Sequence, residues 1–371
     1  MELGLYTFAD LGTDPDTGRT MLPSKRMAHL LEEIALADAV GLDVFGIGEH
    51  HRADYLASTP AVILAAAAAR TKTIRLTSAV TVLSSDDPVR VFQEFTTLDL
   101  LSGGRAEIMV GRGSFIESFP LFGHDLDDYD ALFTEKLDLL LKLRAAGATG
   151  APVTWHGAHR PALDDIAVHP RPEREIPITI AVGGTPQSVA RAGALGLPLA
   201  IAIIGGEPRR FAPLVELYRE AGRRAGQDPA RLKVSINAHG FVGESHQAAA
   251  DALFPAYAEV MGRLGRERGW PPLSRARFDA STQPAGNLVL GSPDEVAEKI
   301  LAQHGYFHHD RFMMQSSLGP APHREVLRSI ELFGMRVAPV IRRELGVGRP
   351  DVAAVTGGDS AALQEEHGTA S

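Results

Sequence analysis

Short apolar runs alternate with longer amphipathic stretches along almost the whole chain. Eight of the runs have the length of a buried strand, and they lie at residues 3–8, 44–48, 74–83, 106–110, 176–182, 199–204, 232–242 and 311–315. Strands that alternate with helices favour a parallel sheet with the helices packed outside it. A doubly wound open sheet has the same local pattern, but the count of eight predicts an α/β fold of the (β/α)8 TIM barrel type.

The stretches between these runs carry the signals of helices. Helices are expected at residues 24–40, 59–70, 88–101, 129–145, 186–195, 208–225, 245–268, 292–304 and 325–343. In the first of them apolar residues recur every three or four positions, Ser24 is the candidate N-cap and Gly41 ends the pattern. Together with the strands, these helices complete the expected barrel.

Two stretches break the regular alternation. Residues 146–175, after the fourth helix, are rich in Gly, Pro, His and Arg and indicate an insertion or a small hairpin. Residues 269–290, which follow the seventh strand and its helix, are a Pro-rich insertion. We expect residues 1–345 to form the barrel. Residues 346–371 have little apolar periodicity and are expected to be a flexible C-terminal tail.

Composition narrows the range of partners. Of the 371 residues 44% are apolar, and the formal net charge of −9 disfavours nucleic acid or an anionic membrane as a partner. The chain contains no cysteine, which excludes disulfides, thiolate catalysis and Cys-ligated metals. It shows neither a signal-peptide pattern nor an apolar run of ~18–20 residues, so a cytoplasmic protein acting on a small-molecule substrate is expected.

Two glycine-containing turns are candidate anion sites, because ligands bind at the C-terminal ends of the strands in either fold. Residues 111–113 read Gly-Arg-Gly, and a guanidinium such as that of Arg112 matches phosphate oxygens. The alternative is a surface turn whose arginine pairs with a carboxylate. Residues 183–188 read Gly-Gly-Thr-Pro-Gln-Ser and place Thr185 and Ser188 hydroxyls at a helix N-terminus. The alternative there is an ordinary capped helix.

Two further segments follow strands. Glu49, His50 and His51 end the second strand, where adjacent side chains point to opposite faces and so do not bind one metal together. One imidazole can face the barrel mouth as an acid, a base or a hydrogen-bond donor. The alternative is a structural histidine. The small residues at 78–80 leave room for a flat ligand, with ordinary barrel packing as the alternative.

Taken together, these segments resemble the bacterial luciferase-like family of flavin-dependent monooxygenases. The resemblance covers residues 1–343 and depends on the order and spacing of several motifs rather than on any single one. The motifs lie at residues 46–51, 77–83, 87–90, 98–105, 111–113, 122–123, 170–172, 195–198 and 291–295.

The resemblance implies that reduced FMN, supplied by a separate flavin reductase, binds at the barrel mouth with O2 as co-substrate. The implied cofactor-binding residues are Ser78, Ala79 and Val80 under the flavin ring, with Ala79–Val80 in cis, and Gly111, Arg112, Gly183, Gly184, Thr185 and Ser188 around the phosphate. His50 matches the catalytic histidine of the family, with Glu49 beside it. The family also implies a homodimer through the second and third helices, which the alanine run at 65–69 suits.

Some alternatives remain open. Luciferase itself has a reactive cysteine where Gly111 stands, which argues against light emission from a long aldehyde. A deazaflavin (F420)-dependent dehydrogenase of the same superfamily and a non-catalytic flavin-binding protein are the main rivals. A metal-dependent hydrolase using His50, His156 and His239 is weaker because their spacing is not that of ligands, and no metal site is predicted.

Overall fold

Eight parallel strands close into a barrel at the centre of the molecule. The structure is a computed structural model that describes residues 1–13, 17–113, 115–315 and 317–346. The barrel strands are β1 (Glu2–Thr7), β2 (Val44–Ile47), β3 (Arg75–Ser78), β5 (Ala106–Gly111), β8 (Ile178–Val182), β9 (Leu199–Ile203), β10 (Val234–Val242) and β12 (Arg311–Gln315). Each strand pairs with the next, and β12 pairs with both β10 and β1, so these eight strands form a closed ring. The predicted TIM barrel is confirmed.

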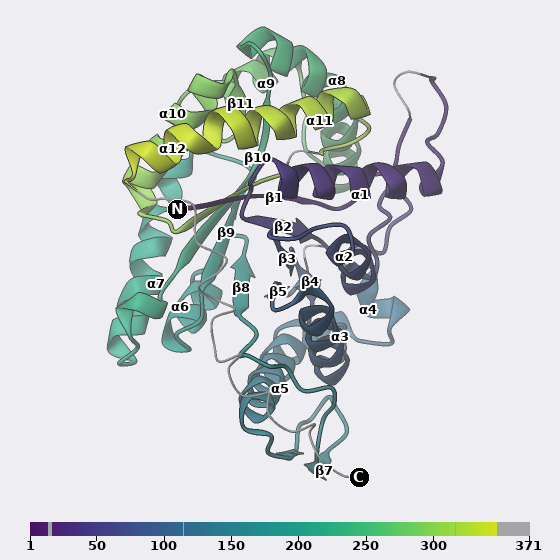
Figure 1. Ribbon diagram of the computed structural model, residues 1–371, viewed down its shortest axis with the longest axis vertical. Helices are drawn as coiled ribbons and strands as arrows, with labels where there is room; N and C mark the ends of the chain where they lie inside the picture. Colours follow the sequence, from purple (N-terminus) through teal and green to yellow (C-terminus); the bar gives the residue numbers. More distant parts are fainter. Residues whose placement is uncertain (14–16, 114, 316, 347–371) are drawn as a thin grey trace, which may run out of the picture.

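Helices surround the strands (Figure 1). They are α1 (Pro23–Ala39), α2 (Pro60–Ala68), α3 (Pro88–Ser102), α5 (Tyr129–Thr149), α6 (Pro186–Ala194), α7 (Ala212–Arg224), α8 (His246–Arg268), α10 (Pro293–Phe307), α11 (His323–Leu332) and α12 (Ala338–Glu344). A π-helical turn over Phe333–Val337 joins α11 to α12. Outward-facing strand residues such as Leu5, Ile108 and Ile201 are fully buried against these helices in the main apolar core.

The first predicted insertion contains a hairpin. Strands β6 (Val153–Trp155) and β7 (Leu163–Ile166) are antiparallel and lie beyond α5 (Figure 1). The second insertion, at residues 269–290, was predicted only as a Pro-rich insertion, with no helix or strand named in it. It contains α9 (Arg275–Thr282), which Ser274 caps by accepting the Arg277 N–H at 3.3 Å. It also contains β11 (Val289–Gly291), which extends the sheet beside the end of β10.

Other boundaries differ from the predictions. The strand expected at residues 74–83 is interrupted, because β3 ends at Ser78 and a short strand, β4 (Thr81–Val82), follows the cis Ala79–Val80 bond. A one-turn helix, α4 (Ser118–Leu121), was not predicted. Ser24 does not cap α1, because Pro23 already occupies the first turn, where its missing N–H costs nothing. The predicted tail at 347–371 lies outside the described residues.

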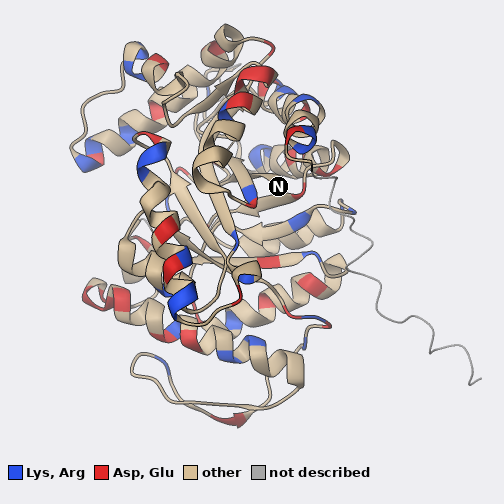
Figure 2. Cartoon of the chain, turned by 90° about the vertical axis from the view of Figure 1, so that its left-hand side faces the viewer, with Lys and Arg blue, Asp and Glu red and all other residues tan. Residues whose placement is uncertain are grey.

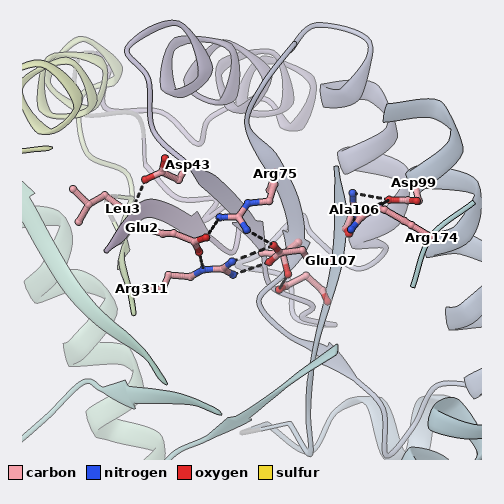
Figure 3. Close-up of polar contacts among 11 residues, drawn as sticks. Glu2, Leu3, Asp43, Arg75, Asp99, Ala106, Glu107, Arg174 and Arg311 are labelled. Carbon is pink, nitrogen blue, oxygen red and sulfur yellow. Dashed lines mark hydrogen bonds and ion pairs between the residues drawn. The ribbon is translucent and has the colours of Figure 1, made fainter. Parts of the chain in front are cut away.

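Charged side chains fill the N-terminal end of the barrel. Glu2, Arg75, Glu107 and Arg311 come from four strands and point toward one another (Figure 3). The Arg311 guanidinium donates to Glu2 and to Glu107, each at 2.7 Å. Burial opposes ionisation of Glu107, but Arg311 and Arg75 outweigh it and hold the pKa of the carboxyl low. This network closes one end of the barrel, so a ligand enters from the other.

The outer surface carries charges of both signs. In Figure 2 the positions of basic and acidic residues are interspersed along the helices of one face. Among the helices of the described residues, none has the length and apolarity that crossing a membrane requires.

Candidate functional site

Small inward-facing residues form part of the floor of the barrel mouth, by which we mean the C-terminal end of the strands. Ala79 on the β3 side and Ala181 on β8 pack on the inner apolar cluster of the barrel, and Val80 lies beside them. Ala181 and Val80 are partly exposed although they lie inside the barrel. A Cβ atom added at Gly183 would meet no heavy atom within 4 Å. Space is therefore free at Gly183, directly after β8.

Ser78 links two neighbouring strands and does not face the barrel mouth. Its side chain is fully buried. The hydroxyl donates to the Met109 carbonyl at 2.8 Å and accepts from the Met109 N–H at 3.0 Å. These bonds join β3 to β5 where the strand is interrupted. Any support that Ser78 gives to a ligand is indirect, through the backbone of residues 79–80.

The two predicted anion-binding turns lie next to each other. Arg112 follows β5, and its Nη2 donates to the Thr185 hydroxyl at 3.2 Å. The guanidinium also lies over the Tyr129 ring, 5.1 Å from its centroid, and the Tyr129 hydroxyl donates to the Gly113 carbonyl at 2.5 Å. The aromatic ring and its hydrogen bond hold the guanidinium over the mouth.

The start of α6 completes this corner. Thr185 stands at the N-cap position, but its side chain makes no capping hydrogen bond, so its hydroxyl is not used by the helix. Gly184 has φ +123, a conformation that a side chain would strain. Ser188 is buried in the first turn. The N–H groups of this turn and the helix dipole both favour an anion.

Arg112 also forms an ion pair with Asp130, the alternative that the sequence left open. The Asp130 side chain is 71% exposed, and ion pairs of this kind contribute about 0–1 kcal/mol. A charge-assisted hydrogen bond to a phosphate oxygen is worth about 1.5–3 kcal/mol. The ion pair with Asp130 is therefore weak enough for a bound anion to replace it.

His50 lies in an aromatic enclosure at the end of β2. The ring centroids of Phe8, Tyr55 and Phe115 are 4.4, 4.5 and 5.0 Å from that of the imidazole. Burial lowers the pKa of His50 to about 4, with the neighbouring Asp54 opposing the shift. The imidazole is therefore neutral at physiological pH and can donate or accept a hydrogen bond without carrying charge.

Glu49 faces away from His50. One carboxylate oxygen accepts the Val82 N–H at 2.8 Å, and the other contacts Nε2 of His51 at 2.8 Å. The Glu49 N–H donates to the Val80 carbonyl at 3.0 Å. Glu49 thus fixes the backbone at Val80 and Val82 by hydrogen bonds and orients His51. These contacts give Glu49 a positioning role. Nothing in them tests its predicted catalytic role, which stays a prediction.

A second group of titratable residues behind Glu49 was missed in the sequence. Burial, with the charge of Glu49, raises the pKa of Asp86 to about 7. Burial lowers the pKa of Lys136 to about 8, and its Nζ donates to the Ser84 carbonyl at 2.8 Å. These residues come from the loop after β4 and from α5. Asp86 lies shortly after the predicted strand at 74–83, but the burial that shifts both pKa values depends on tertiary packing, which the sequence does not show.

The histidines considered for a metal do not come together. No group of three or more His, Cys, Asp or Glu in the described part of the chain has the arrangement of a metal site. His156 is on the exposed hairpin segment, whereas His239 is buried on β10. The mouth instead contains polar residues that the sequence analysis did not select, namely Tyr6, Tyr55 and Gln315. The sequence signal that would have found Tyr6 and Gln315 is their inward position near the ends of β1 and β12.

The chain belongs to the luciferase-like monooxygenase family, whose model matches residues 1–308. It is 26% identical to the uncharacterized protein y4vJ of Sinorhizobium fredii, over 85% of this chain and 92% of that one. It is 27% identical to 4-hydroxyprotoasukamycin monooxygenase of Streptomyces nodosus subsp. asukaensis, over 89% and 88%.

Solved structures share the fold. Monooxygenase RslO1 from Streptomyces bottropensis has a TM-score of 0.78 at 24% identity, covering 91% of this chain and 99% of that one. The oxygenating constituent of 3,6-diketocamphane monooxygenase from Pseudomonas putida, in complex with FMN, has a TM-score of 0.73 at 19% identity, covering 92% and 98%. An F420-dependent secondary alcohol dehydrogenase has a TM-score of 0.71 at 18% identity, covering 92% and 99%. At these identities the likeness establishes the fold alone.

Proposed function

We propose that the protein is a flavin-dependent monooxygenase. It would use reduced FMN from a separate flavin reductase and O2 to oxidise a small organic substrate. The observation that carries the proposal is the 3.2 Å contact between Arg112 and Thr185 at the strand ends that also carry the small residues Ala79 and Ala181. Two curated relatives named as monooxygenases, of Streptomyces and Rhodococcus, support this reaction class.

The residues present fit FMN. Arg112, the Thr185 hydroxyl and the first-turn amides of α6 match a doubly charged phosphate. Ala79, Val80 and Ala181 offer a flat apolar surface to the ring. Glu49 fixes that surface by holding the backbone on both sides of Val80.

Bound reduced flavin supplies the two electrons with which O2 is reduced as one oxygen atom passes to the substrate and the other to water. The chain supplies binding, orientation and exclusion of water. His50 would offer a neutral imidazole at the end of β2, since burial keeps its pKa near 4. It can therefore hold a substrate or an oxygen species by a hydrogen bond without attracting a compensating anion.

Similarity to F420-dependent enzymes favours a second candidate, a deazaflavin-dependent dehydrogenase. One such relative, the F420-dependent glucose-6-phosphate dehydrogenase of Amycolatopsis mediterranei, is 31% identical over 165 residues, covering 42% of this chain and 47% of that protein. Such an enzyme transfers a hydride and does not use O2. The Arg112–Thr185 corner suits the phosphate of either cofactor, so the corner alone does not separate the two functions.

Titration of the purified protein with FMN, reduced FMN and F420 separates these functions. We expect reduced FMN to bind more tightly than F420. We also expect O2 uptake, with NADH and a generic flavin reductase, to rise when a substrate is present. Tighter binding of F420 with hydride transfer to it would identify the dehydrogenase. FMN binding with O2 uptake no faster than free flavin, across a broad substrate panel, would identify a non-catalytic flavin-binding protein.

A further inference from the structure

Three polar side chains occupy the part of the floor that the small residues leave. Gln315 pairs in register with Tyr6 on β1 and with His239 on β10, and paired residues of parallel strands point to the same face. Tyr6 belongs to the inner apolar cluster of the barrel, as does Met313, two residues before Gln315. All three polar side chains therefore point into the barrel at the level of the mouth.

Gln315 has an unused hydrogen-bonding capacity. Its side chain is 1% exposed, and neither its amide oxygen nor its amide nitrogen has a hydrogen-bond partner among the described residues. A buried polar group without a partner is costly, and Gln315 points into the barrel mouth, so its two unpaired atoms are placed to meet a ligand that supplies the partners. An amide offers both a donor and an acceptor, which suits a hydroxyl or a carbonyl group.

The surroundings of Gln315 are polar but uncharged. Burial lowers the pKa of His239 to about 4, and its Nδ1 lies 3.3 Å from the Tyr257 hydroxyl. Burial also raises the pKa of Tyr6 above its usual value, so this side chain stays a neutral phenol. A charged ligand group would meet no opposite charge from these residues, whereas a neutral group finds donors and acceptors.

Apolar residues stand near the C-terminal ends of the barrel strands. Phe8, two residues after Tyr6 and just beyond β1, is partly exposed and contacts the His50 ring. At the rim, Ile116 after β5 is 58% exposed and Ile204 after β9 is 48% exposed. Apolar walls with a few convergent polar groups are typical of a site for a small, mostly apolar ligand.

We propose that Gln315, with Tyr6 and His239, binds a neutral hydroxyl or carbonyl group of an otherwise apolar substrate. The proposal rests on the proposed function in one respect, because the small-residue part of the floor is assigned to the flavin. The substrate then lies between the flavin surface at Ala79 and Val80 and the polar residues of β10, β12 and β1.

Phenol and benzene are suitable probes, since they differ by one hydroxyl group. Their dissociation constants are measured by ligand-observed NMR on the FMN-loaded wild type and on Gln315→Met, which keeps the shape of the side chain but removes both hydrogen-bonding atoms. We expect the wild type to bind phenol about five- to tenfold more tightly than benzene, and the variant to bind the two alike. Tyr6→Phe, which removes a single hydroxyl, is expected to reduce the phenol preference in part.

Gln303→Met is the matched control. Gln303 is 2% exposed and also has both amide atoms unpaired within the described residues, but it lies on α10, outside the barrel. The control should keep the phenol preference, and all three variants should keep wild-type FMN affinity.

The proposal is overturned if the wild type does not bind phenol up to the solubility of phenol. It is also overturned if both Gln315→Met and Tyr6→Phe keep the wild-type preference for phenol. Loss of FMN affinity in Gln315→Met with unchanged phenol binding would assign the amide to the flavin and also overturn it. If the wild type binds no FMN, the same comparison is made without it. A preference for phenol that Gln315→Met abolishes would then support this subsite while the proposed function fails.

Discussion

At the scale of single residues, buried neutral histidines determine how the fold responds to acid. His309 is 1% exposed, and neither ring nitrogen has a hydrogen-bond partner among the described residues. Burial, with smaller effects from His304 and the N-terminal amine, lowers the pKa of His309 to about 3. Because the folded-state pKa lies below the unfolded value of 6.5, stability is lost as pH falls from about 6.5 toward 3.

His309→Leu should therefore flatten the acid limb of the stability curve. The change removes a group that must stay uncharged in the fold, a penalty on the order of a few kcal/mol near pH 3. Urea unfolding at several pH values between 4 and 8 measures the effect. His156→Leu, at an exposed position, is the control and should follow the wild type. An equally steep acid limb in His309→Leu would show that this histidine does not limit acid stability.

At the scale of elements, one buried arginine joins the ends of two helices and a strand. Arg105 precedes β5 and is 6% exposed. Its guanidinium donates to the carbonyl groups of Ala68, Thr71, Ile74 and Ser102, at 2.8 to 3.1 Å, and to the Thr71 hydroxyl. These bonds fix the ends of α2 and α3 against the start of β3.

Arg105→Met should destabilise the protein by about 2–5 kcal/mol, since it leaves several buried carbonyl groups without donors. The free energy of unfolding in urea measures this. Arg70→Met, at an exposed position after α2, is the control and should change stability by less than about 0.5 kcal/mol. A loss for Arg105→Met no larger than that of the control would contradict the account.

The sequence predicted the elements better than their contacts. All eight barrel strands and their order followed from apolar runs, because a buried strand needs a continuous apolar stretch. The break at Ala79–Val80 followed only from the resemblance, since nothing local distinguishes it from a continuous strand. Helix α9 was missed because proline and polar residues around it masked a short helix that tertiary packing supports.

In the candidate site, too, local sequence patterns were predicted and long-range contacts were not. Arg112 and Thr185 were selected because glycine-containing turns after strands have a recognisable pattern, and the structure brings them within hydrogen-bonding distance. Asp86 and Gln315 were missed, because their properties arise from burial and register, which depend on residues far away in the chain.

At the scale of the whole molecule, α2 and α3 present an apolar outer face. The two helices pack side by side. Val62 on α2 is 67% exposed and Leu101 on α3 is 65% exposed. We propose that this face forms the homodimer interface implied by the family resemblance, since large exposed apolar patches mark association sites.

Val62→Asp should shift the protein from dimer to monomer, because a charge in the centre of an apolar interface cannot be solvated. Size-exclusion chromatography with light scattering measures the mass. Met335→Asp, at a position 60% exposed on the turn between α11 and α12, is the control and should leave the mass unchanged. A wild type that is monomeric throughout, or a Val62→Asp protein that remains dimeric, would contradict the interface.

The central claim of the account is that Arg112 and Thr185 hold the phosphate of a flavin. Calorimetric titration of the wild type and Arg112→Met with FMN and with riboflavin, which lacks the phosphate, tests it most directly. We predict that Arg112→Met weakens FMN binding by about 10- to 100-fold and leaves riboflavin binding unchanged. Asp130→Asn, which removes the competing carboxylate, should tighten FMN binding by about two- to fivefold. Equal affinity of the wild type and Arg112→Met for FMN would contradict the claim.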